Sequence, residues 1–180
     1  LYAPKCSGCN ACIPARVPVD NFKWSRAQKR CWKKNDDIMV EQLDSINIGE
    51  HFPIYARYIE QRHSDGDMYP PSRRQFEDFL GNAWECTQFL EFRLGDQLIG
   101  CAVIDVIHNG LSAIYTYFDP AFSERGLGVL AILVEIDMAQ RLGLEYLYLG
   151  YWISGCDKME YKTKYRPIEL YRQNSWGIAE

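Results

Sequence analysis

Two glycines, Gly126 and Gly128, stand at the entrance to a long apolar stretch and are the first candidates for a chemical role. Residues 127–142 that follow have the length and the apolar spacing of a helix. The first N–H groups of a helix have no partner within it, and glycine has no Cβ to block a close approach. The spacing therefore predicts an anion site, although both glycines could instead only let the loop turn tightly.

A second chemical feature is the basic stretch from Arg16 to Lys34. It contains seven basic residues and one acid, Asp20, although the whole chain has a formal net charge of −4. Trp24 and Trp32 are interleaved with the cations and offer surfaces on which bases can stack. The pattern suits contact with a nucleic-acid backbone through Lys29, Arg30, Lys33 and Lys34, and a merely solvated face is the equal alternative.

Cys6, Cys9 and Cys12 form a C-x2-C-x2-C run, a spacing that lets thiolates converge on one metal or cluster. Three ligands are one short of a closed zinc or iron–sulfur site, and Arg16 stands where a ferredoxin run has its fourth cysteine. Reduced thiols in a loop are the alternative, unless a missing upstream segment supplies a further ligand. The other four cysteines are scattered, which does not indicate a disulfide framework and predicts a reducing, cytoplasmic setting.

The elements around the glycines set their position. LSAIYTYF is rich in aromatic and β-branched residues and predicts a strand, which Asp119-Pro120 ends. Two strands precede it, TQFLEFRL and QLIGCAVIDVI, with turns predicted at Gly95-Asp96 and Asn109-Gly110. Helices are expected over residues 51–63 and 73–80, and a buried strand over 144–153. A strand that returns after a crossover helix should lie parallel to the one before it.

Composition indicates an ordinary globular protein, because 47% of the 180 residues are hydrophobic and 24% are charged. No apolar run approaches the roughly 20 residues that a membrane-spanning helix needs, so we expect the protein not to associate with a membrane. The chain opens on Leu1 rather than Met, which suggests a fragment. We expect residues 1–48 to be a cysteine-rich basic segment that remains of a larger N-terminal domain, and residues 49–180 to be the main domain.

The order of elements resembles the GNAT acyltransferase plan. That resemblance implies an α+β fold with a mixed, mainly antiparallel sheet flanked by helices. It also implies that the glycine loop binds a phosphate-bearing acyl carrier, while the strands around the helix separate to admit an amine. Acyl-CoA members usually carry Gln or Arg three residues before the first glycine, where this chain has Ser123. An acetyl-CoA-dependent N-acetyltransferase is therefore an alternative that Ser123 disfavours.

Four longer stretches are similar to the N-end aminoacyltransferases, which take the acyl group from aminoacyl-tRNA. They are CSGCNACIPARVPVDNFKWSRAQKR, YARYIEQRH with the following DGDMY, GLSAIYTYFDPAFSERGLGVLAI, and YLYLGYWISGCDKMEYKTKYRPIE. The pattern CxxCxxCIPxRVPV most resembles the bacterial aspartate/glutamate leucyltransferases. The resemblance implies transfer of Leu from leucyl-tRNA to proteins that begin with Asp or Glu, which marks them for degradation. Arginyl transfer from arginyl-tRNA is the alternative, and so is a non-catalytic RNA-binding module.

Transfer of an aminoacyl ester to an amine needs no ATP and no redox cofactor, and we expect no cofactor and no DNA partner. The enzyme must position the substrates, accept a proton and stabilise an oxyanion. For the end of the aminoacyl-tRNA we expect a donor site made of Arg125, Gly126, Gly128, Tyr115 and Tyr117. The two tyrosines share one face of their strand, and the alternative is that they only pack. Asp119 is the candidate to hold or deprotonate the amine, its alternative role being to cap the loop.

An acceptor that begins with Asp or Glu presents a carboxylate, which requires a cation in the cleft. The segment after the last predicted strand supplies Lys158, Tyr161 and Lys162, which would share one face if the segment is helical. Arg57 and Arg62 on the first predicted helix are further candidates for the acceptor. His51 and His108 are expected to be ordinary surface or turn residues.

Overall fold

The computed structural model describes residues 6–81 and 84–179, which form one eight-stranded sheet in the order β2-β3-β4-β5-β6-β1-β7-β8. The strands are β1 (Ile13–Pro18), β2 (Ile38–Leu43), β3 (Thr87–Leu94), β4 (Gln97–Ile107), β5 (Gly110–Phe118), β6 (Tyr146–Trp152), β7 (Glu169–Arg172) and β8 (Ser175–Ile178). Every neighbouring pair is antiparallel except β5 and β6, which are parallel. The predicted mixed, mainly antiparallel sheet is confirmed.

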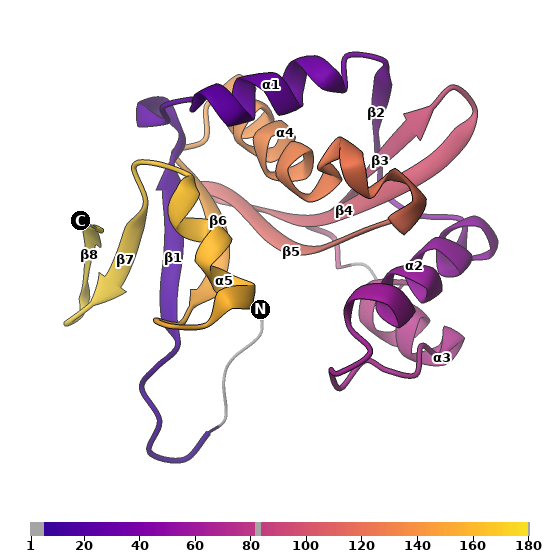
Figure 1. Ribbon diagram of the computed structural model, residues 1–180. Helices are drawn as coiled ribbons and strands as arrows, with labels where there is room; N and C mark the ends of the chain where they lie inside the picture. The colour runs from indigo at the N-terminus through magenta and orange to yellow at the C-terminus, as the bar shows by residue number, and fades with distance from the viewer. Residues whose placement is uncertain (1–5, 82–83, 180) are drawn as a thin grey trace.

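Helices lie on both faces of this sheet (Figure 1). They are α1 (Arg26–Lys34), α2 (Ile48–Arg62), α3 (Arg73–Phe76), α4 (Leu127–Arg141) and α5 (Asp157–Glu160), with short 3-10 segments η1 (Val19–Asn21), η3 (Pro120–Arg125) and η4 (Tyr161–Lys164), and a π-helical turn η2 (Glu77–Gly81). The helices α1 and α4 cover one face, and α2 and α3 cover the other face over the middle strands. Within the described residues, no helix is both long and apolar enough to cross a membrane.

The apolar helix α4 is buried on most sides, which explains why its sequence lacks a clear polar face. Its residues pack with those of the sheet strands in the larger core, for example Leu133 with Ile104 and Leu147. The helix α1 packs against its outer side. A second core, on the opposite face, gathers apolar residues of α2, α3 and the sheet.

The strands β5 and β6 pair along only a short length. Their paired residues are Gly110 with Tyr146, Leu111 with Leu147, and Ser112 with Tyr148. Beyond Tyr148, β6 continues beside β1 as far as Trp152 and no longer pairs with β5. The parallel pairing is as predicted, and the strands separate on the side where α4 begins.

Four strands of the sheet were not predicted, namely β1, β2, β7 and β8. Residues 38–43, for which no strand was predicted, form the edge strand β2. Most β2 side chains are exposed, so the segment lacks the alternating apolar pattern of a half-buried strand. The segment 1–48 also contributes β1, which pairs with both β6 and β7. Its described part therefore shares one sheet with the rest of the chain.

Candidate active site

The glycine turn at the start of α4 has the geometry of an anion site. Gly126 caps the helix in the left-handed region, with φ +69°, a conformation that favours glycine. A Cβ placed on Gly128 would meet only the ring of Phe118, at 3.7 Å. The first N–H groups of α4 carry the positive end of the helix dipole and have no partner within the helix. The turn can therefore receive a phosphate.

A hollow of about 380 Å³ adjoins this turn. It brings together residues of α1, the glycine turn and the end of η4, which are distant in sequence. It is lined by Ser25, Ala27, Gln28, Arg30, Cys31, Lys34, Glu124, Arg125, Gly126, Val129, Lys164 and Tyr165. The predicted backbone contacts Arg30 and Lys34 thus lie beside the predicted donor residues Arg125 and Gly126. Lys164 belongs to the basic segment expected near the tRNA end or the acceptor, whereas Tyr165 was not predicted there.

Short side-chain contacts fix α1 against the glycine turn. The Asn35 amide donates to the carbonyl of Arg125 at 2.9 Å, and the Lys34 ammonium donates to the carbonyl of Glu124 at 2.7 Å. The Cys31 thiol lies 3.6 Å from the Gly126 carbonyl, and burial raises its pKa. On the other side, the Gln28 amide donates to the carbonyl of Lys164 at 3.1 Å. The basic helix is therefore held at the predicted phosphate site.

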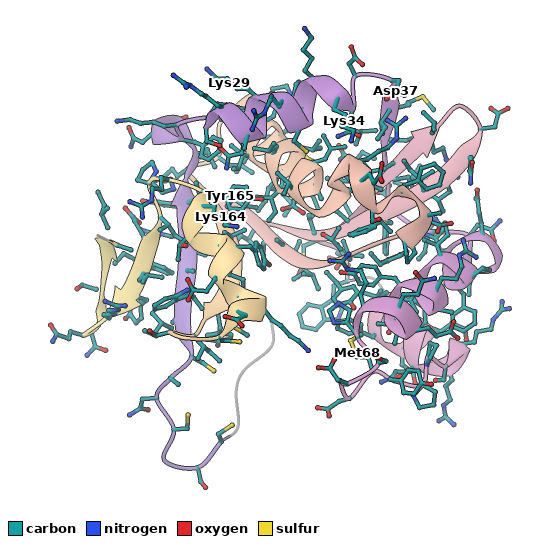
Figure 2. The ribbon with its side chains drawn as sticks, in the orientation of Figure 1. Lys29, Lys34, Asp37, Met68, Lys164 and Tyr165 are labelled. Carbon is teal, nitrogen blue, oxygen red and sulfur yellow. The ribbon has the colours of Figure 1, made fainter. Side chains whose placement is uncertain are left out.

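The sequence of α1 explains this placement. Ser25 and Gln28 form a capping box, in which each side chain bonds the other's backbone N–H. Gln28 and Cys31 lie on the inner side, while Lys29 and Lys33 are exposed and do not line the hollow. Figure 2 shows Lys29 on the outer side of α1, with Lys34, Lys164 and Tyr165 nearer to α4. Two cations of the predicted set thus line the hollow and two lie outside it.

Arg125 is already engaged by an acid. Its guanidinium donates two hydrogen bonds to Asp37, at 2.7 and 2.9 Å. Hydrogen bonding to Arg125 lowers the pKa of the Asp37 carboxyl. A phosphate that binds at this place therefore competes with Asp37 for the guanidinium.

At the end of β5, Asp119 is paired with a second predicted site residue, Arg57. Its Oδ1 accepts from the N–H of Ala121 at 3.0 Å, which is the capping role given above as the alternative. Its Oδ2 accepts from the Arg57 guanidinium at 2.6 Å. Asp119 is only 8% exposed, whereas the Arg57 side chain is 44% exposed. Both oxygens of Asp119 are used, so in this structure it positions Arg57 and the loop.

The two tyrosines of β5 lie on the face opposite the glycine turn, which corrects their expected place in the donor site. Tyr117 is fully buried, and its hydroxyl lies 2.7 Å from Nδ1 of His51. Tyr115 is partly buried among the rings of α2, including Tyr55 at 6.3 Å between centroids. Side chains alternate across a strand, so it is Phe118 that faces α4.

His51 is also a correction, because it is buried rather than on the surface. Its Nε2 lies 2.7 Å from Glu91, which also accepts from Arg93 at 2.7 Å. Burial lowers the pKa of His51. Helical spacing contained the signal, since residues 51, 54, 55 and 59 are the buried positions of α2. His108 is exposed, as expected.

The predicted acceptor residues after β6 do not share one environment. The Lys158 ammonium is exposed and pairs with Asp65 at 2.7 Å. Lys162 is only 7% exposed, and its ammonium donates to the carbonyl of Tyr151. Burial lowers the pKa of Lys162. The helix changes from α to 3-10 geometry at Tyr161, so the expected common face is not formed.

Arg62, the last candidate for the acceptor, ends α2 with its guanidinium 5.4 Å from the ring centroid of Phe118. Arg57 and Arg62 thus approach the end of β5 from the same helix. The remaining tyrosine, Tyr161, is 43% exposed beside Lys162.

The clustered cysteines lie apart from these groups. Cys6 and Cys9 are exposed, Cys12 is partly exposed, and all seven cysteines are free. In residues 6–81 and 84–179, no group of three His, Cys, Asp or Glu side chains is placed to hold a metal ion. A site completed by a ligand from outside this chain stays a prediction.

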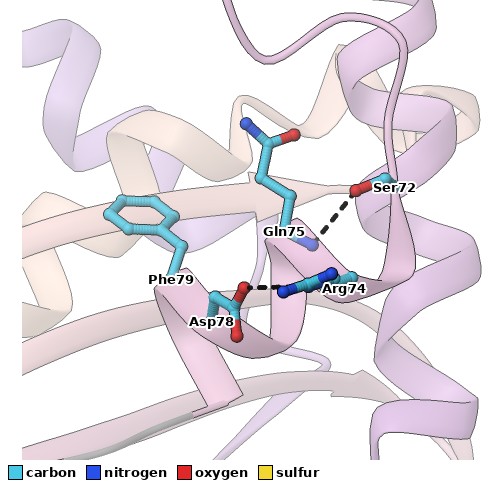
Figure 3. Close-up of a pocket in the computed structure, with 5 residues that line it drawn as sticks. All are labelled: Ser72, Arg74, Gln75, Asp78 and Phe79. Atoms are coloured by element: carbon cyan, nitrogen blue, oxygen red, sulfur yellow. Dashed lines mark hydrogen bonds and ion pairs between the residues drawn. The ribbon is translucent and has the colours of Figure 1, made fainter.

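A second surface hollow belongs to a single segment and gathers no groups from elsewhere (Figure 3). Ser72 caps α3 by accepting from the N–H of Gln75, and Arg74 pairs with Asp78 across one turn. Phe79 is 47% exposed, in the segment where the helix changes to π geometry after Phe76. These contacts are those of an ordinary capped helix.

Comparison with known proteins identifies relatives of this chain. Residues 1–30 and 50–172 match the family models of the N terminus and the C terminus of arginine-tRNA-protein transferase. The chain is 54% identical over 178 residues to the aspartate/glutamate leucyltransferase of Pseudomonas fluorescens strain Pf0-1, covering 99% of this chain and 76% of that protein. It is 51% identical over 177 residues to the aspartate/glutamate leucyltransferase of Saccharophagus degradans, covering 98% and 75%.

A solved structure shows the fold independently of close sequence similarity. The ribosomal-protein-S18-alanine N-acetyltransferase of Escherichia coli superposes with a TM-score of 0.54 at 16% identity, covering 71% of this chain and 74% of that one. The predicted GNAT-like fold is confirmed. With both family models matched in order along the sequence, the chain belongs to the arginine-tRNA-protein transferase family.

Proposed function

We propose that this protein transfers leucine from leucyl-tRNA to the N-terminal α-amine of proteins that begin with Asp or Glu. The observation that carries the proposal is the identity of 51–54% to proteins named aspartate/glutamate leucyltransferase, over nearly the whole chain. The product would carry a new N-terminal leucine and be marked for degradation. Arginine, the residue named in the family description, is the alternative to leucine.

The donor side of the reaction fits the hollow between α1 and the glycine turn. The phosphates at the 3′ end of the tRNA would lie at the N-terminus of α4, close to Arg30, Lys34 and Lys164. The exposed Lys29 and Lys33 would meet the backbone further along the acceptor stem. The rings of Trp24 and Trp32 pack edge to face, with 5.3 Å between their centroids. Trp32 is partly exposed, so its ring is available for a base to stack on.

The acceptor side fits the pair of Arg57 and Asp119. Arg57 is the exposed member of the pair, and its guanidinium can bind a carboxylate with two hydrogen bonds. Asp119 would hold it in place beside the end of β5. We favour Arg57 over Lys158 for this role, because both members of the Lys158–Asp65 pair are exposed to solvent.

The chemistry requires no cofactor. The amine attacks the ester carbon, the amide forms, and the terminal ribose hydroxyl leaves. An α-amino group has a pKa of about 7.7–8.0, so a usable fraction is neutral at pH 7. The demands on the protein are positioning, a proton acceptor and donors for the oxyanion.

The direct test uses tRNA charged with radiolabelled leucine or arginine and model proteins that begin with Asp, Glu or Lys. We expect leucine to appear on the Asp and Glu proteins and not on the Lys protein. Transfer of arginine alone would replace leucine by arginine in the proposal. Transfer of neither, with acetylation from acetyl-CoA, would overturn it.

A further inference from the structure

The middle of α4 carries an acid that the reaction above does not use. Glu135 is fully buried, and neither carboxylate oxygen has a hydrogen-bond partner among the described residues. Burial raises its pKa to about 8. Nearly all buried polar groups in native proteins are paired, and an unpaired charge in the interior is costly. Such a carboxyl group is a candidate for binding a ligand that supplies donors.

Helical spacing places Glu135 toward the region in which β5 and β6 have separated. It follows Gly128 by seven residues, or about two helical turns, and so lies on the same face of α4. Gly128 faces Phe118 at the end of β5. At about 1.5 Å per residue, Glu135 lies about 10 Å from Gly128 along the helix axis, toward the C-terminus of α4. This depth corresponds to the part of β5 between Ser112, where pairing with β6 stops, and Phe118.

Two phenols from the segment that follows β6 lie close enough to Glu135 for its charge to act on them. Burial raises the pKa of Tyr161 to about 12, and the charge of Glu135 adds to the effect. Burial also raises the pKa of Tyr165, again with a contribution from Glu135. Tyr161 is itself 43% exposed, so the segment beside the acid lies at the protein surface.

The other elements packed on α4 supply no counter-ion among the residues that the structure describes. The strands β4, β5 and β6 present apolar side chains to the helix, among them Ile104, Leu111 and Leu147. From α1, the Cys31 thiol contacts the glycine turn. The segment η1 also packs on α4, and its titratable residue, Asp20, is an exposed acid. Lys162 is buried in the same segment as Tyr161, yet its ammonium bonds the Tyr151 carbonyl and not Glu135.

We propose that Glu135 is a binding site for the α-ammonium group of a substrate. The inference rests on the proposed transferase function, because both substrates of that reaction carry such a group. One is the α-ammonium of the aminoacyl donor, and the other is that of the acceptor's first residue. A primary ammonium supplies both positive charge and N–H donors to the two unpaired oxygens.

Binding of this kind releases a proton. At pH 7 the free carboxyl group is mostly neutral, because its pKa is about 8. The free α-amine is mostly ammonium. The complex of carboxylate and ammonium holds one proton fewer than the two separate partners, and that proton goes to the solvent. If the acceptor is the ligand, transfer of a second proton from nitrogen to the carboxylate frees the lone pair for attack on the ester.

Titration calorimetry at pH 7, in two buffers with different ionisation enthalpies, counts the protons released. The donor probe is leucyl-3′-aminoadenosine with a stable amide link, and the acceptor probe is a short peptide that begins with Asp. Each is compared with its N-acetylated form. We expect one of the two free amines to release about one proton and to bind about ten- to a hundredfold more tightly than its acetylated form. The probe that does so identifies the substrate.

The variant Glu135→Gln should abolish both effects. The amide has the shape of the neutral acid, so the fold should tolerate it. Asp137→Asn, on the more exposed side of the same helix where Asp137 pairs with Arg141, is the matched control and should keep both effects. Proton release that persists in Glu135→Gln, or its absence with both probes in the parent, would overturn the proposal. Leucine transfer by the same parent preparation shows separately whether the transferase function holds.

Discussion

The guanidinium of Arg57 in α2 lies 2.6 Å from the carboxylate of Asp119 at the end of β5, across 62 positions of sequence. This pair joins a helix on one face of the sheet to the loop that leads into the glycine turn on the other. Because Asp119 also accepts from the N–H of Ala121, its charge is committed to holding its neighbours. Arg57, whose side chain is 44% exposed, is a cation that a substrate can reach near the separated strands.

The first prediction concerns the choice of acceptor. Replacing Arg57 with Gln should lower the preference for acceptors beginning with Asp over Asn by about tenfold, since the variant cannot make a charged hydrogen bond at this partly exposed site. The measurement is kcat/KM for the two acceptors. Lys158→Met is the comparison variant and should keep the parent's preference. The opposite result, with Lys158 decisive and Arg57 silent, would assign the carboxylate to the segment after β6.

The second prediction concerns tRNA. Replacing Lys29, Arg30, Lys33 and Lys34 together with Ala should weaken binding and flatten its salt dependence, by about 0.7–0.9 in log–log slope for each phosphate that the variant no longer neutralises. Lys164→Ala should do the same for one phosphate, because Lys164 lines the same hollow. Arg74→Ala removes an exposed cation from α3 and should leave the slope unchanged. If none of these variants alters the salt dependence of tRNA binding, the basic side chains of α1 are only solvated and do not contact the tRNA.

The third prediction separates the two glycines. Gly128→Val should fold normally, because a Cβ there meets only the Phe118 ring at an ordinary distance, yet transfer should fall sharply as the side chain fills the phosphate site. Gly126→Ala should instead lower the free energy of unfolding by about 1–2 kcal/mol, since its φ is +69°. Chemical denaturation and transfer assays on both variants check this contrast. Full activity in a folded Gly128→Val would remove the turn from the donor site.

Much of the fold was predictable because it is encoded locally. The turn at Gly95-Asp96 follows from its residue pair, because Leu94 pairs with Gln97 on either side of it. The turn predicted at Asn109-Gly110 lies one residue earlier, because Ile107 pairs with Gly110 and a Cβ on Gly110 would collide with the Tyr146 carbonyl. The capping box of Ser25 and Gln28 is likewise local. The edge strand β2 was missed because its side chains are mostly exposed, so its pairing with β3 leaves no apolar alternation in the sequence.

The site was less predictable because the residues that meet there are distant in sequence. The basic helix and the glycine turn were each recognised, but the hydrogen bond between Asn35 and Arg125 that joins them spans 90 positions. Tyr115 and Tyr117 were assigned to the donor site because they flank the glycine loop in sequence. A strand's alternation leaves two faces, and only packing shows that theirs is the face of α2.

The last prediction concerns His51, which joins Glu91 to Tyr117 inside the second core. Because the Glu91 carboxylate accepts, Nε2 carries the proton and Nδ1 accepts from the Tyr117 hydroxyl. His51→Leu leaves the buried Tyr117 hydroxyl and one Glu91 carboxylate oxygen without their histidine partner. We expect each loss to lower the free energy of unfolding by roughly 1–3 kcal/mol. Tyr117→Phe orphans only Nδ1 and should cost less. Urea denaturation of the two variants measures the difference.

The same network predicts a dependence on pH. Burial lowers the pKa of His51 in the folded protein, so the unfolded chain binds a proton first as the pH falls below about 6.5. Stability from neutral His51 is therefore complete above that pH and declines as the pH falls toward the folded pKa. The stability gap between the parent and His51→Leu should narrow from pH 7 to pH 5. If the difference in stability stays constant over this range, the pKa of His51 is the same in the folded and unfolded protein. That result would contradict the assignment of a neutral buried imidazole.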